Sequence, residues 1–116
     1  MRVFVRGNDF VVTDDIAAWA RARMEAAVGQ HERRLDAVDV RLRDLNGPRH
    51  GGPRDMECGV AVRLRPTGSV LVTESADDLY AAVSRAADRL KNAVGRRLAR
   101  TNRRRGGDAR YPSALE

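Results

Sequence analysis

Hydrophobic and polar side chains alternate along several short stretches of this chain. Alternation with a period of two predicts β-strands, because successive side chains of a strand point to opposite faces of a sheet. Around residue 40, for example, Val38, Val40 and Leu42 alternate with charged residues. Sheets built from such strands have one covered face and one solvent-exposed face. Strands are therefore expected at residues 1–6, 38–43, 58–65 and 70–73.

Apolar residues that recur every three to four positions predict a first helix that begins after Thr13. Thr13 is suited to the N-cap position, and Asp14 and Asp15 place negative charge in the first turn, where the helix dipole favours it. Gly29 lowers helix propensity by about 1 kcal/mol relative to alanine. We therefore expect the helix to bend or end near Gly29 and to stop by about Arg33. The side chains expected to face the core are Ile16, Ala20, Met24, Ala27 and Val28.

The same period continues for longer in the C-terminal part of the chain, where we expect one long helix from Ser75 to Arg105. Ser75 is the expected N-cap, with Asp78 three residues later as in a capping box. The apolar stripe of this helix is expected to fade after Val94, although the helix itself continues. The members of that stripe are Leu79, Val83, Ala86, Ala87, Leu90 and Val94.

Segments rich in glycine and proline separate these elements. Turns are expected at Gly7-Asn8-Asp9 and Pro66-Thr67-Gly68-Ser69, and a longer link at residues 46–54. The order of elements is β-α-β-β-β-α, which predicts a two-layer α+β domain with two helices on one face of a four-stranded sheet. We expect this domain to cover residues 1–105 and a disordered tail to follow at residues 106–116.

Arginines form a second stripe along the long helix. On a wheel of about 100° per residue they fall within about 60° of one another, beside the apolar stripe. Guanidinium groups bind phosphate in bidentate fashion, so a rigid row of them suits a polyanion. We refer to the following residues as the arginine stripe: Arg85, Arg89, Arg96, Arg100 and Arg103.

The positive charge of the chain is concentrated in the same region. The whole chain carries a net charge of +6, with 22 basic and 16 acidic residues. Residues 89–105 hold eight basic and no acidic side chains, whereas residues 1–88 and 106–116 each sum to −1. This clustering favours binding to nucleic acid. A solvated arginine-rich face, or an anionic membrane or acidic protein as partner, are the alternatives that the charge pattern leaves open.

The sequence gives little support to other kinds of chemistry. No apolar run is long enough to span a bilayer, and the N-terminus lacks the apolar segment of a signal peptide, so a soluble cytoplasmic protein is expected. The single cysteine, Cys58, excludes an internal disulfide and is expected to be a buried, inert thiol. His31 and His50 have no further ligand at metal-binding spacing. No catalytic residue, metal site or cofactor is expected, and Trp19 and Tyr80 are assigned to core packing rather than to stacking on bases.

Three segments of the chain resemble the family of ribosome hibernation-promoting factors, also called ribosome-associated inhibitors or sigma-54 modulation proteins. The first contains Val5-Arg6-Gly7-Asn8 and Val12-Thr13-Asp14-Asp15-Ile16, and the second is the pair of alternating strands before residue 66. The third and most specific is Asp78-Leu79-Tyr80-Ala81-Ala82-Val83. The resemblance covers about residues 1–105 and is to a short form of the family or to the N-terminal domain of a long form.

The resemblance implies a fold similar to that of double-stranded-RNA-binding domains and a non-enzymatic function. Such proteins bind the small ribosomal subunit where mRNA and tRNA would lie, and they hold idle ribosomes inactive during stress or stationary phase. Arg89, Arg96 and Arg97 match basic positions of the family, whereas Asn92 stands where a basic residue is usual. An edge strand beside the longer link leaves a homodimer possible, but the sequence does not imply one.

The charge pattern and the resemblance together give a set of expected rRNA contacts, all on the two helices: Arg23, Arg85, Arg89, Lys91, Arg96, Arg97, Arg100, Arg103 and Arg104. A second group on the first helix and the open sheet face would extend this surface: Arg21, Arg33, Arg34, Arg41, Arg43, Arg63 and Arg65. Alternatively, the sheet residues of this second group pair with Asp39 and Glu57. The small ribosomal subunit is the expected partner, with no membrane and no small-molecule substrate. A regulatory module that binds an acidic protein, and a generic RNA binder, are the alternatives.

Overall fold

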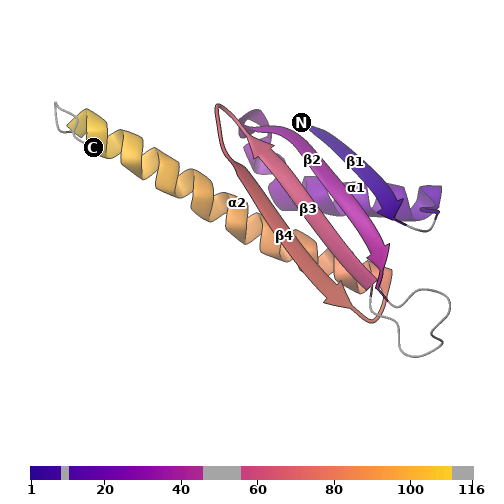
Figure 1. Cartoon of the computed structure of the whole chain (residues 1–116). Helices are drawn as coiled ribbons and strands as arrows, with labels where there is room; N and C mark the ends of the chain where they lie inside the picture. Colours follow the sequence, from indigo (N-terminus) through magenta and orange to yellow (C-terminus); the bar gives the residue numbers. More distant parts are fainter. Residues whose placement is uncertain (9–10, 46–55, 111–116) are drawn as a thin grey trace.

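The computed structural model describes residues 1–8, 11–45 and 56–110, and the side chains of these ranges as far as residue 100. The elements follow the predicted order β-α-β-β-β-α, with one short 3₁₀ helix, η1, added after the first helix (Figure 1). In chain order they are β1 (Arg2–Asn8), α1 (Asp14–Val28), η1 (Gly29–Arg34), β2 (Leu35–Asp44), β3 (Met56–Leu64), β4 (Ser69–Ala76) and α2 (Leu79–Arg110).

The four strands form one mixed sheet in the order β1-β2-β3-β4. Strand β1 pairs with β2 in parallel, and the two other pairs are antiparallel. Both α-helices cover the same face of the sheet, so the predicted two-layer α+β fold is confirmed (Figure 1). The opposite face, which we call the open face, carries no helix among the described residues, and β1 and β4 are the edge strands.

The core lies between the sheet and the helices, and it follows the alternation of the sequence. Val38, Val40 and Leu42 of β2 are fully buried, as are Cys58 and Val60 of β3. Their neighbours in the sequence face the open side and are charged or small, as period-two side-chain geometry requires. Each helix contributes its apolar stripe to the same core.

Helix α1 begins as the sequence predicts. The hydroxyl of Thr13 accepts a hydrogen bond from the backbone N–H of Ile16 at 3.2 Å, which confirms Thr13 as the N-cap. The α-helix ends at Val28, and η1 carries the chain in helical turns from Gly29 to Arg34. The predicted break at the glycine is therefore confirmed.

The start of α2 differs from the prediction, because Ser75 is not its N-cap. Ser75 belongs to β4, where it pairs with Glu57 of β3. The N-cap is Asp78: its side chain accepts a hydrogen bond from the N–H of Ala81 at 2.8 Å, and its carbonyl accepts one from Ala82 at 3.0 Å. Pairing with β3 thus extends the last strand by three residues beyond the predicted end at Thr73 and delays the helix.

Other boundaries also move by a few residues. Gly7 and Asn8, which were predicted to turn, continue β1 because they pair in parallel with Leu42 and Arg43. Helix α2 extends five residues beyond the predicted end at Arg105, to Arg110. The link at residues 46–54, the third residue of the first turn (Asp9) and the tail after residue 110 lie outside the described residues.

Candidate nucleic-acid interface

Helix α2 has one side in the core and extends well beyond the sheet (Figure 1). Its buried side chains include Leu79, Val83, Leu90 and Val94, and they continue to Leu98, which is 5% exposed. The apolar stripe therefore reaches one turn further than predicted. Twelve residues follow Leu98, about 18 Å of helix at 1.5 Å per residue. We refer to residues 99–110 as the arm.

The N-terminal half of the arginine stripe is held against the edge strand β4. The Nη1 atom of Arg89 lies 2.6 Å from a carboxylate oxygen of Glu74, and Nη1 of Arg85 donates to the carbonyl of Ser75 at 3.3 Å. The Arg89 side chain is still 60% exposed. These two guanidinium groups are thus positioned along the outer edge of the sheet by its own strand.

Two arginines in the C-terminal half of the stripe are open to solvent. Arg96 and Arg100 are exposed, and neither has a hydrogen bond or ion pair within the part of the chain that the structure describes. Lys91, on another side of α2, is exposed and unpaired in the same sense. The backbones of Arg103 and Arg104 continue in the arm, and their side chains lie outside the described part. The stripe therefore passes from partnered to unpartnered arginines toward the arm.

Arg97 lies at the turn between β3 and β4. Its Nη1 atom donates to the carbonyl of Ser69 at 3.0 Å. Gly68 in that turn has a φ of 107°, a left-handed conformation that favours glycine. A Cβ atom at Gly68 would lie 2.7 Å from Nη2 of Arg97, so a larger residue there would displace this guanidinium group. Arg97 therefore ties the last core turns of α2 to the sheet.

Two further groups of predicted contacts lie on the N-terminal half of the domain. Arg23 of α1 bridges the two helices: its Nη2 atom lies 3.6 Å from Asp88 and donates to the carbonyl of Ser84 at 3.4 Å. Arg21 and Arg33 are exposed, without a partner among the described residues. Arg34 donates through Nε to the carbonyl of Arg65 at 3.1 Å, which joins η1 to the end of β3.

The arginines of the open face have carboxylate partners. Asp39 lies 3.0 Å from Arg6 and 4.0 Å from Arg41, and Glu57 lies 3.7 Å from Arg43. Asp36 pairs with both remaining arginines of the second predicted group, Arg63 at 3.9 Å and Arg65 at 3.3 Å. Pairing with Asp39 and Glu57 was predicted as the alternative to RNA contact, and pairing through Asp36 was not foreseen.

Cys58 lies in the core and Trp19 packs against it, whereas Tyr80 is 46% exposed, so the core position predicted for Tyr80 is wrong. The rings of Trp19 and Tyr80 pack edge to face with centroids 4.8 Å apart, which joins α1 to the first turn of α2. Cys58 is fully buried, as predicted. Burial, together with the charge of Glu57, raises the pKa of the Cys58 thiol to about 12. The thiolate needed for nucleophilic attack is therefore scarce at neutral pH.

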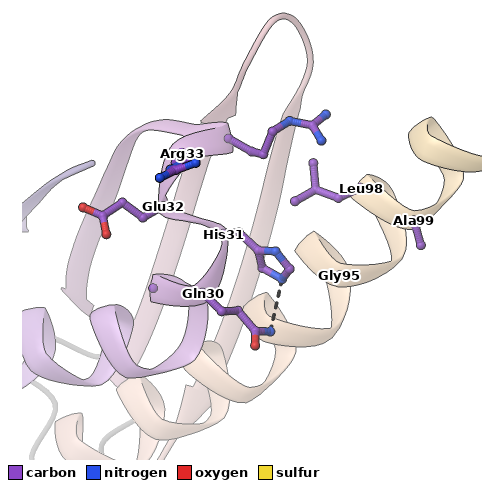
Figure 2. Close-up of a pocket in the computed structure, with 9 residues that line it drawn as sticks. Gln30, His31, Glu32, Arg33, Gly95, Leu98 and Ala99 are labelled. Carbon is purple, nitrogen blue, oxygen red and sulfur yellow. Dashed lines mark hydrogen bonds between the residues drawn. The ribbon is translucent and has the colours of Figure 1, made fainter. Parts of the chain in front are cut away.

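A hollow of about 610 Å³ separates η1 from α2. Gly29, Gln30 and His31 line one side of it, and Gly95, Leu98 and Ala99 line the other (Figure 2). We call this site the η1–α2 hollow. From the sequence, Gly29 was predicted only to break a helix and His31 was weighed only as a metal ligand, because neither periodicity nor charge indicates that η1 and α2 meet.

Two observations bear on other classes of function. Among the described residues, no group of three His, Cys, Asp or Glu side chains is arranged to hold a metal ion; His50 lies outside that part. Neither described α-helix contains a stretch that is both long enough and apolar enough to cross a membrane.

Comparison with known proteins places the chain in a family. Residues 3–102 match the family described as sigma 54 modulation protein / S30EA ribosomal protein. The chain belongs to this family. The resemblance stated from the three sequence segments is thereby confirmed, and the match spans every element from β1 to the start of the arm.

Individual relatives agree with this membership. The chain is 24% identical over 83 residues to the chloroplastic ribosome-binding factor PSRP1 of Spinacia oleracea; the match covers 72% of this chain and 28% of that protein, so the chain spans well under half of this relative. The Protein Y N-terminal domain of Thermus thermophilus is 28% identical, with a TM-score of 0.66 over 83% of this chain and 98% of that one. A ribosomal subunit interface protein of Coxiella burnetii has the same fold, with a TM-score of 0.67 at 12% identity over 85% of this chain and 99% of that one.

Proposed function

We propose that this protein binds the small ribosomal subunit through rRNA phosphates, occupies the channel of mRNA and tRNA, and so inhibits translation in idle ribosomes. The observation that carries the proposal is the pair Arg96 and Arg100, two exposed guanidinium groups one helical turn apart without partners in the described part of the chain. They lie where α2 extends beyond the sheet, so a large polyanion reaches them without a steric clash with the rest of the domain.

The physics of structured RNA suits this arrangement. Folded rRNA presents phosphates and shape more than readable base edges, so recognition depends on charges held at fixed spacing. A helix anchored in a core holds its arginines at such spacing, and guanidinium binds phosphate in bidentate geometry. Occupying a channel needs no catalysis, because steric exclusion of mRNA and tRNA is sufficient. The proposed function is therefore that of a non-enzymatic inhibitor that needs no cofactor.

The comparisons support the choice of the ribosome over other polyanions. The relative from Spinacia oleracea is named as a ribosome-binding factor, and the Coxiella burnetii structure as a ribosomal subunit interface protein. The family match covers the sheet, α1, η1 and α2 as far as residue 102, so the arginines of α1 and η1 lie in the same matched region as Arg96 and Arg100. A cytoplasmic location, with the small subunit as partner, is part of the proposal.

Co-sedimentation with purified subunits tests the proposal. The protein is expected to pellet with small subunits at moderate salt and to be released as salt rises, because each phosphate contact releases counterions. Preloaded mRNA and tRNA should reduce binding if the channel is the site. Protein that remains in the supernatant while a known subunit-binding control pellets would overturn the proposal.

Competition separates the two alternatives. A generic RNA binder would be displaced from small subunits by an excess of bulk tRNA, whereas a channel-specific protein would be retained. A module for an acidic protein would instead bind its partner equally well after nuclease treatment. Either outcome would replace the ribosome as the principal target.

A further inference from the structure

The η1–α2 hollow has space that the chain itself does not use. A Cβ atom built on Gly29 or on Gly95 would meet no other atom within 4 Å, apart from chain neighbours and the helix's own backbone. Neither glycine is therefore required by close packing within the described residues. A glycine in a helix interior is less favourable than alanine. Gly95 therefore lowers the stability of α2, and no packing contact within the described residues compensates for it.

The walls of the hollow carry groups that suit a nucleobase. His31 points toward α2, and its Nε2 atom lies in hydrogen-bond contact with Nε2 of Gln30 at 3.2 Å, which restrains the ring (Figure 2). Leu98, which is 5% exposed, closes the apolar side of the hollow. Unstacked RNA bases pack on aromatic rings including histidine and accept hydrogen bonds from side-chain amides.

The rim of the hollow is suited to phosphate. Arg33 lines it, is exposed, and has no hydrogen bond or ion pair within the described residues. The one carboxylate of the lining, Glu32, points away from α2 (Figure 2). At about 610 Å³ the volume lies within the range of sites that hold small organic ligands.

We propose that the η1–α2 hollow receives one unstacked nucleotide of RNA, with its base between His31 and the Gly95 side of α2 and its phosphate at Arg33. This inference rests on the proposed function, since it supplies an rRNA contact beside the arginine stripe. It adds a contact that reads an exposed base rather than backbone charge alone. The two glycines keep the space open for that base.

Backbone amide signals of Gly29 and Gly95 in an NMR titration report on the hollow directly. The probes are a six-nucleotide oligoadenylate, 5′-AMP and inorganic phosphate. Saturable shifts of both glycine signals are expected with the oligonucleotide and with AMP, and not with phosphate alone. A response to AMP that the oligonucleotide lacks would assign the hollow to a free nucleotide and overturn the RNA proposal. Equal shifts with phosphate alone, or none with either nucleotide, would also overturn it.

Filling the hollow provides the second test. Gly95→Leu adds a side chain where space is open and improves helix propensity, so the variant is expected to fold and to keep its circular dichroism spectrum. It should lose the nucleotide-dependent shift at Gly29 and bind small subunits about tenfold more weakly, the size of one lost base-stacking contact. The matched control is Ala18→Leu, which places the same leucine side chain at an exposed position of α1 outside the hollow and should bind as the unmodified protein does.

The outcomes for the two proposals differ. If Gly95→Leu binds small subunits normally while the variant lacking the Arg96 and Arg100 side chains does not, the hollow proposal fails and the proposed function stands. If the unmodified protein does not bind small subunits but its hollow responds to the oligonucleotide, the proposed function fails and the nucleotide site stands.

Discussion

Arg89 of α2 and Glu74 of β4 form an ion pair with 2.6 Å between Nη1 and a carboxylate oxygen. The Arg89 side chain is 60% exposed, so under the proposed function an rRNA phosphate would compete with Glu74 for the same guanidinium group. An exposed pair of this kind contributes up to about 1 kcal/mol. Under the proposed function, displacing Glu74 would offset part of the free energy that Arg89 contributes to RNA binding.

Glu74→Gln is expected to strengthen binding to small subunits by about two- to fivefold, because Arg89 no longer has a charged competitor. The measurement is the dissociation constant at fixed salt. Glu57→Gln is the matched control, since it removes the same charge from the partner of Arg43 on the open face. An equal gain in the control would mean that net charge, and not the release of Arg89, controls affinity.

Replacement of both Arg96 and Arg100 by alanine should weaken binding and lower the slope of log K against log salt by roughly 1.5, the contribution of two phosphate contacts. Both side chains are exposed and unpaired among the described residues, so the free energy of unfolding should change by less than about 0.5 kcal/mol. Arg41→Ala with Arg43→Ala serves as the control pair on the open face. If that pair lowers the slope instead, the binding surface lies on the sheet.

The N-cap of α2 is Asp78 in the structure, whereas the sequence predicted Ser75. Asp78→Ala removes the acceptor of the Ala81 N–H and should lower the free energy of unfolding by about 1 kcal/mol, within a range of 0.5–2. Ser75→Ala should be nearly neutral, because Ser75 lies in β4 and engages Arg85 through its backbone carbonyl. Urea denaturation of both variants measures the difference, and a larger loss for Ser75→Ala would reassign the cap.

Leu98 is the last buried side chain of α2 in the described part of the chain. Leu98→Ala should destabilise the domain by about 2–3 kcal/mol, since it removes buried methyl groups and leaves a cavity. Leu71 on the open face is 74% exposed, so Leu71→Ala should change stability by less than about 0.5 kcal/mol. Thermal and urea unfolding give both values. A small effect at Leu98 would show that the core ends earlier on α2.

The thiol of Cys58 gives a prediction for alkaline pH. Its pKa is raised from 9.0 to about 12 in the folded protein, so the unfolded state releases this proton first as pH rises. The protonated thiol therefore contributes to the free energy of unfolding. This contribution is fully present below pH 9 and is lost between pH 9 and 12, at a rate of about 1 kcal/mol per pH unit. Cys58→Ala, compared with the unmodified protein by urea denaturation, should lack this part of the decline. Rapid alkylation of Cys58 in native protein at neutral pH would contradict the burial on which the prediction depends.

The sequence predicted the layers well because they depend on period. Alternation identified the inward faces of β2 and β3, and the helical period identified the buried side of α2. Local chemistry also placed the first cap, at Thr13. Boundaries that depend on pairing were wrong: Gly7 and Ser75 carry turn and cap signals, yet partners on the neighbouring strand keep both in the sheet.

The site was less predictable for a related reason. A helical wheel places Arg89 and Arg96 on one side of α2, but it does not show that β4 lies beside the first and solvent beside the second. The partner Glu74 and the hollow between Gly29 and Gly95 arise from the approach of distant segments. The family resemblance indicated which positions are basic, but not which of these side chains have partners in the folded chain.

The helical state of the arm depends on the charges that the arginines of α2 carry. Starting a helix is the unfavourable step, by a factor of about 10⁻³, whereas extension of an existing helix is nearly neutral. The core-packed turns of α2 from Leu79 to Leu98 are a permanent nucleus, so the arm grows from an end that already exists. Arg96 and Arg100 are like charges four residues apart and oppose that growth by a few tenths of a kcal/mol. An anion bound to both would remove this opposition, so anion binding would stabilise the helical form that α2 has as far as Arg110.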